Sequence, residues 1–299
     1  MDERDEFSPP IIIAQRIKDQ HPVPFSKENT PIFYSNLEEA FATRKENNNF
    51  YSFVQTAWQS GNAVDFSSTD TLSLGSSGLL RAEFMEELSR NSNFMLGPGG
   101  SRLSDGNYNY LDQVEQEIAS FHNAETGLIV ASGFEANVAI FTSVPRPGDA
   151  IVYDELVHIS THEGMKQSLA MMRAEFRHND IDHFRETLVS VIDSQPQIKR
   201  GKRSVIIAVE SIYSMDGDIC PLEELLQITK SLFPKGNYAF VVDEAHSTGI
   251  VGPKGAGLVC ELKLEKEMAI VVHTGGKGLA SSGGKDTPTS VPADLKLTV

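Results

Sequence analysis

The sequence of 299 residues contains two cysteines, Cys220 and Cys260, too few for a disulfide framework. The N-terminal residues Met1–Glu6 are acidic rather than basic, and the apolar stretch Ile11–Ala14 is shorter than the hydrophobic core of a secretory signal. No segment approaches the run of about 18 apolar residues that crosses a bilayer. These absences predict a cytoplasmic protein without a membrane span.

Basic residues are also scarce, because 26 Lys and Arg stand against 41 Asp and Glu and leave a formal net charge of -15. Such a protein repels nucleic-acid phosphates unless a basic patch is concentrated somewhere. The densest basic run, Lys199–Arg203, precedes an apolar run and is typical of a solvated loop before a strand. We therefore expect no nucleic-acid partner.

No G-x-x-x-x-G-K-[ST] sequence occurs in the chain, so a P-loop nucleotide site is not predicted. This absence matters because Asp243–His246 spells the DEAH box of helicases, which requires an upstream P-loop. The acidic charge balance also disfavours a helicase. The motif at Asp243–His246 therefore needs a different explanation.

From Gly127 onward, apolar runs typical of buried strands alternate with helical patterns. The runs are 127–131, 150–153, 204–209, 238–242 and 268–272. Helical periodicity is present in Pro221–Phe233 and in the segment Leu111–Phe121. Strands that are apolar on both faces and alternate with helices predict an α/β fold, with a mostly parallel sheet and helices on both faces.

The chain divides by composition into three segments. Residues 1–62 are polar and rich in proline, with one amphipathic stretch near Leu37–Phe41, and are expected to form an N-terminal arm. Residues 63–284 contain the predicted strands and are expected to form the main domain. Residues 285–299 contain two prolines and no periodicity, and are expected to be a disordered tail.

In an open parallel sheet, ligands bind outside the carboxyl ends of the strands. Candidate site residues follow each predicted strand and are expected to meet at that edge. They are Ser132, Gly133 and Phe134, then His158, then Glu210 and Ser214, then Asp243 and His246, and last Thr274 and Lys277.

Lys277 lies between glycines, which let the backbone approach another group closely. A lysine that is partly desolvated there has a lowered pKa and becomes an amine nucleophile suited to a Schiff base. Taken alone, the motif also fits a surface lysine in a glycine-rich turn.

Asp243 ends an apolar run, so its carboxylate is expected to be partly buried and to need a cationic or hydrogen-bonding partner. A protonated pyridine nitrogen is such a partner, and it makes pyridoxal 5′-phosphate (PLP) an electron sink. His246 could donate a hydrogen bond to the phenolic oxygen of that ring. The alternative is an N-cap aspartate followed by an ordinary loop histidine.

Ser132-Gly133-Phe134 precedes an apolar-periodic helix, whose N-terminal N–H groups could bind a phosphate. His158 could stack on a flat cofactor, although a lone histidine is more often structural. His158 and His162 have the spacing of two metal ligands on a helix, but Ile159 replaces the glutamate of H-E-x-x-H, so no metal site is predicted.

These residues lie in ordered motifs that resemble the α-oxoamine synthases, the PLP enzymes of fold type I that include 8-amino-7-oxononanoate synthase, 5-aminolevulinate synthase and serine palmitoyltransferase. The matching motifs run from about Phe66 to Gly284. They are Phe66–Asp70, Gly97–Arg102, Ser132–Asn137, Glu210 with Ser214–Asp218, Asp243–Gly249 and Thr274–Gly278.

The resemblance implies PLP as cofactor, with Lys277, His158 and Asp243 as catalytic residues. Lys277 would bind the cofactor covalently, Asp243 would hold the pyridinium nitrogen, and His246 the phenolic oxygen. His158 would stack on the ring, Glu210 and Ser214 would contact the cofactor, and Ser132, Gly133, Phe134 and Thr274 would line its phosphate region.

The reaction implied is the decarboxylative condensation of an amino acid with an acyl-CoA thioester, carried out by a homodimer. A PLP-dependent aminotransferase of class I/II and a catalytically inactive homologue are the alternatives. Thr69 stands where the family usually has asparagine, which puts the amino-acid preference in doubt. The family pattern stops near Gly284, so we expect the C-terminal small domain to be missing.

Overall fold

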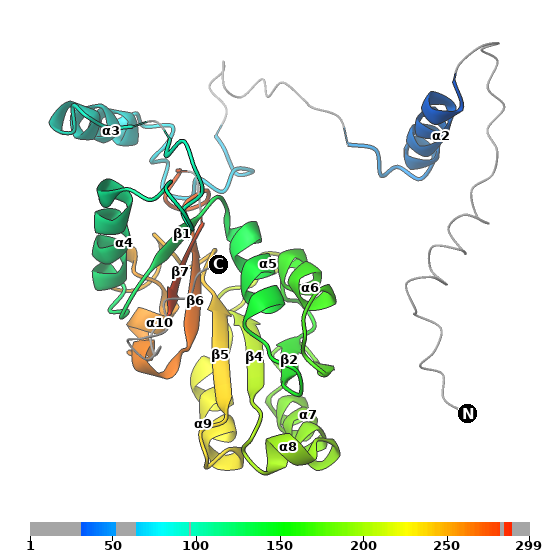
Figure 1. Cartoon of the computed structure of the whole chain (residues 1–299). Coiled ribbons are helices and arrows are strands. Elements are labelled where there is room, and N and C mark those ends of the chain that lie inside the picture. Colours follow the sequence, from blue (N-terminus) through cyan, green and yellow to red (C-terminus); the bar gives the residue numbers. More distant parts are fainter. Residues whose placement is uncertain (1–30, 52–63, 96, 282–283, 289–299) are drawn as a thin grey trace. The chain divides into compact units, whose positions relative to one another are not determined.

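Figure 1 shows the computed structural model of the chain, of which we describe residues 31–51, 64–95, 97–281 and 284–288. The chain divides into two compact units, Met1–Phe66 and Ser67–Val299. In the first unit, helix α2 (Ile32–Glu46) contains the amphipathic stretch predicted near Leu37–Phe41. Most of the predicted arm 1–62 lies outside the described residues.

The second unit alternates strands and helices. Its helices are α3 (Leu79–Arg90), α4 (Asn109–Phe121), α5 (Gly133–Ser143), α6 (Ile159–Lys166), α7 (Ile181–Ser194), α8 (Pro196–Lys199), α9 (Leu222–Leu232) and α10 (Leu258–Glu261), with 3-10 turns at Pro253–Gly255 and Glu265–Glu267. Its strands are β1 (Leu128–Val130), β2 (Ala150–Asp154), β3 (Met172–Phe176), β4 (Val205–Glu210), β5 (Tyr238–Asp243), β6 (Ile270–Thr274) and β7 (Gly284–Pro288). Within the described ranges, no helix combines the length and the apolar character needed to cross a membrane.

The strands form one seven-stranded sheet in the order β1-β7-β6-β5-β4-β2-β3. From β6 to β3 every neighbouring pair is parallel, because a helical crossover returns the chain to the same edge each time. Strand β7 runs antiparallel to both β1 and β6. The predicted α/β class and mostly parallel sheet are confirmed.

Strand β4 shows why the sheet needs helices on both faces, since all of its side chains are buried. Ile207 packs in one core cluster with Leu188 of α7 and Leu225 of α9. Its neighbour Ile206 packs in a second cluster with Ile140 of α5. Alternate residues of a strand point to opposite faces, so the two clusters lie on opposite sides of the sheet. Helices therefore cover both faces, as predicted.

Two strands of the sheet, β3 and β7, were not predicted. Strand β3 lies at the edge of the sheet, where the exposed Arg173 and Glu175 interrupt its apolar pattern. Strand β7 includes Lys285–Pro288, so the expected disorder of 285–299 is wrong for these residues. Their backbone pairs with β1 on one side and β6 on the other, and these hydrogen bonds do not require apolar side chains. Residues 289–299 lie outside the described residues.

Candidate active site

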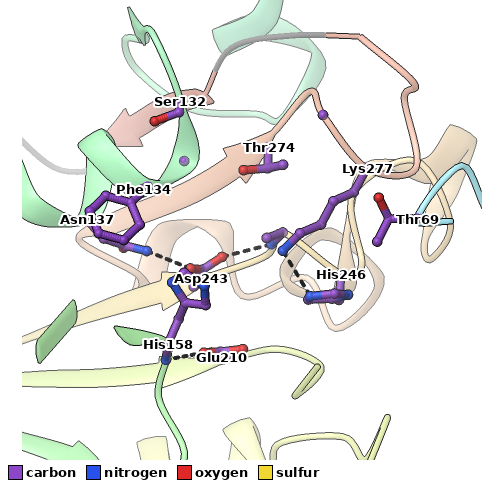
Figure 2. Close-up of a pocket in the computed structure, with 13 residues that line it drawn as sticks. Thr69, Ser132, Phe134, Asn137, His158, Glu210, Asp243, His246, Thr274 and Lys277 are labelled. Carbon is purple, nitrogen blue, oxygen red and sulfur yellow. Dashed lines mark hydrogen bonds between the residues drawn. The ribbon is translucent and has the colours of Figure 1, made fainter. Parts of the chain in front are cut away.

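A cavity of about 300 Å³ opens where β4, β5 and β6 end and α5 and α6 begin (Figure 2). Side chains from distant parts of the sequence line it. They are Thr69, Ser132, Gly133, Phe134, Asn137, His158, Glu210, Asp243, Ala245, His246, Thr274, Gly276 and Lys277. The structure thus brings together every predicted site residue except Ser214.

Ser214 lies in an exposed turn after β4 and does not line this cavity. Among the lining residues that were not predicted as site residues, Asn137 has the clearest sequence signal. It is an amide within the apolar pattern of α5, one helical turn after Gly133, and its side chain is buried. A buried amide must find hydrogen-bond partners, which is a reason to expect it near other polar groups.

The side chain of Lys277 crosses the cavity toward His246, and its Nζ lies 2.9 Å from Nε2 of that residue (Figure 2). Burial lowers the pKa of Lys277, although the negative charges of Asp243 and Glu210 act in the opposite direction. Burial also lowers the pKa of His246, and the positive charge of Lys277 lowers it further. Both shifts favour an uncharged amine beside an uncharged imidazole.

Gly278 explains how the turn that carries Lys277 reaches this position. A Cβ atom at residue 278 would lie 2.7 Å from the carbonyl oxygen of Thr248, which is closer than real contacts allow. The missing side chain therefore lets the turn after β6 pack on the turn after β5 that contains His246. This is the close backbone approach that the glycine pattern predicts.

Asp243 ends β5 and is 9% exposed. Its Oδ1 accepts a hydrogen bond from the backbone N–H of Ala245 at 2.9 Å, and its Oδ2 accepts one from Nδ2 of Asn137 at 2.7 Å. These bonds orient the carboxylate and leave lone pairs on both oxygens for a further donor. The carboxylate is therefore positioned to receive a cationic N–H group.

Glu210 ends β4 beside Asp243, its partner in the sheet register. Burial and the negative charge of Asp243 raise the pKa of Glu210 to about 8. Its Oε1 accepts a hydrogen bond of 2.6 Å from the backbone N–H of His158, which holds the start of α6 against the sheet. Glu210 is therefore a carboxyl group with a raised pKa that anchors His158.

The N-terminus of α5 forms another wall. Ser132 is its N-cap, with Oγ accepting a hydrogen bond from the N–H of Glu135 at 3.1 Å. A Cβ atom at Gly133 would lie 2.0 Å from Oγ1 of Thr274, so the first turn of α5 approaches the side chain at the end of β6 closely where residue 133 has no side chain. N–H groups at a helix start favour an anion.

His158 and His162, the histidine pair with the spacing of metal ligands, have different surroundings in the structure. His162 does not line the cavity, and its ring packs edge-on against Tyr153 at a centroid distance of 5.4 Å. In the part of the chain that the structure describes, no group of three or more His, Cys, Asp or Glu side chains could hold a metal ion.

The cavity thus combines a partly desolvated amine, a buried carboxylate and a helix N-terminus. The amine can react with a carbonyl carbon, the carboxylate can pair with a protonated ring nitrogen, and the helix start can bind a phosphate. One ligand that presents all three groups would use the whole cavity.

The sequence profile of the family described as aminotransferase class I and II matches residues 62–285. Over 271 residues the chain is 55% identical to "Aminoacyl transferase sphA" of Byssochlamys spectabilis, which covers 91% of this chain and 58% of the relative. It is 50% identical over 222 residues to an 8-amino-7-oxononanoate synthase of Emericella nidulans, which covers 74% of this chain and 54% of that protein. The chain therefore spans little more than half the length of these relatives.

Solved structures of serine palmitoyltransferases and of an 8-amino-7-oxononanoate synthase are similar to this chain. The serine palmitoyltransferase of Sphingomonas wittichii superposes with a TM-score of 0.57 at 27% identity, over 64% of this chain and 45% of that chain. A structure of SPT with a PLP internal aldimine has a TM-score of 0.57 at 28% identity and the same coverage of both chains. The 8-amino-7-oxononanoate synthase of Francisella tularensis has a TM-score of 0.55 at 26% identity, over 77% of this chain and 59% of that chain.

Proposed function

This chain belongs to the aminotransferase class I and II family and, within it, to the α-oxoamine synthases, and we propose that its cavity binds PLP covalently through Lys277. The resemblance predicted from the motifs is thereby confirmed at the level of the family. PLP is the cofactor of this family. The assignment of each cofactor contact to a residue of this chain is our proposal.

The observation that carries the proposal is the joint position of Lys277, Asp243 and the start of α5 around one cavity. Lys277 has the reactive amine, and Asp243 would hold the protonated ring nitrogen. The phosphate would bind at the N–H groups after Ser132, beside Gly133 and Thr274. His246 would face the phenolic oxygen, and Phe134, His158 and Glu210 would complete the walls. Ser214 is exposed and does not line the cavity, so its predicted contact with the cofactor is not supported.

For the reaction, we propose an acyl transfer in which an amino acid condenses with an acyl-CoA thioester. The α-carbon of the amino acid bonds to the thioester carbonyl carbon, and carbon dioxide and the CoA thiol leave. Bound PLP supplies the electron sink that stabilises negative charge at that α-carbon. The incoming amino acid would take the place of Lys277 on the cofactor, and the freed amine of Lys277 would then accept the α-proton, because burial lowers its pKa and keeps more of it uncharged near neutral pH.

Two alternatives share the same cavity. A class I/II aminotransferase would also use Lys277 and Asp243, but it releases no carbon dioxide, so product analysis separates it from the condensation. A catalytically inactive homologue would act only as a binding partner of a full-length relative, and co-purification with that relative without any cofactor absorbance would favour it. We further propose that residues 63–284 form the PLP-binding domain. We also propose that the protein works as a homodimer. Its cytoplasmic location stays a prediction.

The proposal is tested by mixing the purified protein with PLP and recording the visible spectrum before and after borohydride. We expect a visible absorption band that borohydride removes. Reduction should leave the pyridoxyl group attached to the peptide that contains Lys277. The variant K277A should lack this band, whereas K199A, which removes a lysine with a side-chain exposure of 61%, should retain it. A band of equal size in K277A would remove Lys277 from its proposed role.

A further inference from the structure

A buried chain of hydrogen bonds joins Asp243 to His158. Nδ2 of Asn137 lies 2.7 Å from Oδ2 of Asp243 and 3.1 Å from Oγ of Ser160. Oγ of Ser160 in turn lies 2.7 Å from Nδ1 of His158. Asn137 is 2% exposed and Ser160 is fully buried, so water does not compete for these bonds. Figure 2 shows the link between Asn137 and Asp243.

The contact of α5 with α6 holds Asn137 and Ser160 together. Gly164 of α6 faces α5, and a Cβ atom there would lie 2.9 Å from Cβ of Phe141 and 3.0 Å from the carbonyl oxygen of Asn137. The two helices therefore approach closely because residue 164 is glycine. Their spacing brings an amide of one helix within reach of a hydroxyl of the other.

The direction of these hydrogen bonds follows from groups that can only donate. The amide nitrogen of Asn137 donates one hydrogen to Asp243 and the other to Oγ of Ser160. The backbone N–H of Ser160 donates to Nδ1 of His158 at 3.2 Å, so this ring nitrogen carries a lone pair. The Ser160 hydroxyl then also donates to Nδ1, and the proton of the neutral imidazole is on Nε2.

We propose that Ser160 and Asn137 are positioning residues that keep His158 in its neutral form with the proton on Nε2, turned toward Asp243 and the cavity. This proposal rests on the proposed function only in giving His158 a role beside a bound cofactor. The network itself belongs to the protein without any ligand. Its consequence is a flat, uncharged ring in the cavity wall whose one N–H donor is at Nε2.

The charges around His158 do not by themselves impose this state. Asp243 favours the charged imidazolium, whereas burial, the largest effect, and the charge of Lys277 favour the neutral ring, so that the pKa of His158 is lowered. The carboxyl of Glu210 binds the backbone N–H of His158, and His246 lies on the other side of the cavity beside Lys277. Protonation of Nδ1 would remove the hydrogen bond from the backbone N–H of Ser160 and would require its hydroxyl to turn from donor to acceptor, which adds a geometric barrier to charging.

The test is an NMR titration of the protein labelled with nitrogen-15 in its histidine rings, without added cofactor. The His158 signals are assigned by their loss in H158Q. In the unmodified protein we expect Nδ1 to have the shift of an unprotonated nitrogen and Nε2 that of a protonated one. In S160A the neutral ring loses the hydrogen bond from the Ser160 hydroxyl, so the pKa of His158 should rise. The rise should be about 0.5–1 unit, which corresponds to the net free energy of one hydrogen bond between neutral groups.

N137A provides a second variant, because it removes the amide that holds Oγ of Ser160 in place beside Nδ1 and that donates to Asp243, and it should also raise the pKa of His158. The matched control is S168A, which removes a hydroxyl that accepts a hydrogen bond from the N–H of Ala170 away from the cavity. This control should leave His158 unchanged. Circular dichroism confirms that each variant folds.

An unchanged His158 pKa and tautomer in both S160A and N137A would overturn the proposal. Because the titration needs no PLP, it is independent of the proposed function. If PLP fails to bind while the titration behaves as expected, the proposed function fails and the positioning role stands.

Discussion

The 2.9 Å contact between Nζ of Lys277 and Nε2 of His246 links the protonation of the two groups. A charged Lys277 can only donate to Nε2 of a neutral His246, whereas an uncharged Lys277 can also accept a hydrogen bond from Nε2–H, so the tautomer of His246 depends on the charge of Lys277. The pKa of each residue is lowered mainly by burial. The amine of Lys277 is therefore uncharged over a wider pH range than that of an exposed lysine.

This relationship predicts that Lys277 reacts with aldehydes at lower pH than other lysines. Labelling with PLP and cyanoborohydride, followed by peptide mapping from pH 7 to 10, should give a midpoint for Lys277 below the ordinary lysine value of 10.5. The exposed Lys199 serves as the internal control. Identical pH profiles for the two lysines would contradict the desolvated position of Lys277.

Asp243 is expected to control turnover more than cofactor retention. In D243N the side chain keeps its shape but loses the charge that would hold the ring nitrogen protonated. We expect PLP to remain partly bound and the exchange of the α-proton of added amino acids in D₂O, followed by NMR, to slow by about 100-fold or more. D193N, at an exposed carboxylate, is the control. Unchanged exchange in D243N would refute the assignment.

Gly133 is expected to tolerate a side chain poorly while Thr274 is present. A Cβ atom would overlap Oγ1 of Thr274 at 2.0 Å, so G133A should lower the free energy of unfolding by about 1–3 kcal/mol and weaken PLP binding. Urea denaturation and a PLP titration measure the two effects. The double variant G133A/T274A removes the overlapping atom and should recover stability relative to G133A. Full stability of G133A would show that α5 and β6 do not meet this closely.

His178 is expected to make stability depend on pH near neutrality. Its Nδ1 lies 2.8 Å from Oδ1 of Asp154, and its Nε2 lies 2.5 Å from Oδ2 of Asp218. Asp218 belongs to the loop that also carries Ser214. Burial alone would lower the pKa of His178, but the hydrogen bonds and charges of the two carboxylates outweigh it and raise the pKa above 6.5.

The stability from this raised pKa is fully present below the unfolded value of 6.5 and is lost as the pH rises through the higher pKa of the folded protein. Between pH 6 and 9, the unmodified protein should lose about 1–2 kcal/mol more than H178Q does. Urea denaturation at each pH measures this difference. Parallel pH curves for the two proteins would show that the bridge to Asp154 and Asp218 contributes nothing.

Much of the cavity was predictable because parallel strands end at a common edge. Glu210, Asp243 and Thr274 are the last residues of β4, β5 and β6, so locating the apolar runs was sufficient to place them together. His246 and Lys277 follow the strand ends closely and share the same edge. Ser214 also follows a strand, but its loop turns outward, and no local pattern indicates the path of a loop.

By itself the sequence determined the α/β class, the order of most elements and the residues gathered at the sheet edge. Local apolar patterns locate the buried strands and helices, and parallel strands end at the same edge of a sheet. Tertiary structure alone decided the features that depend on partners distant in the chain. Strand β7 exists because β1 and β6 both offer backbone groups to it, despite its polar residues. The link from Asp243 through Asn137 and Ser160 to His158 likewise exists only because two helices pack closely at Gly164, and hydrogen bonds of this kind depend on geometry that no single segment contains.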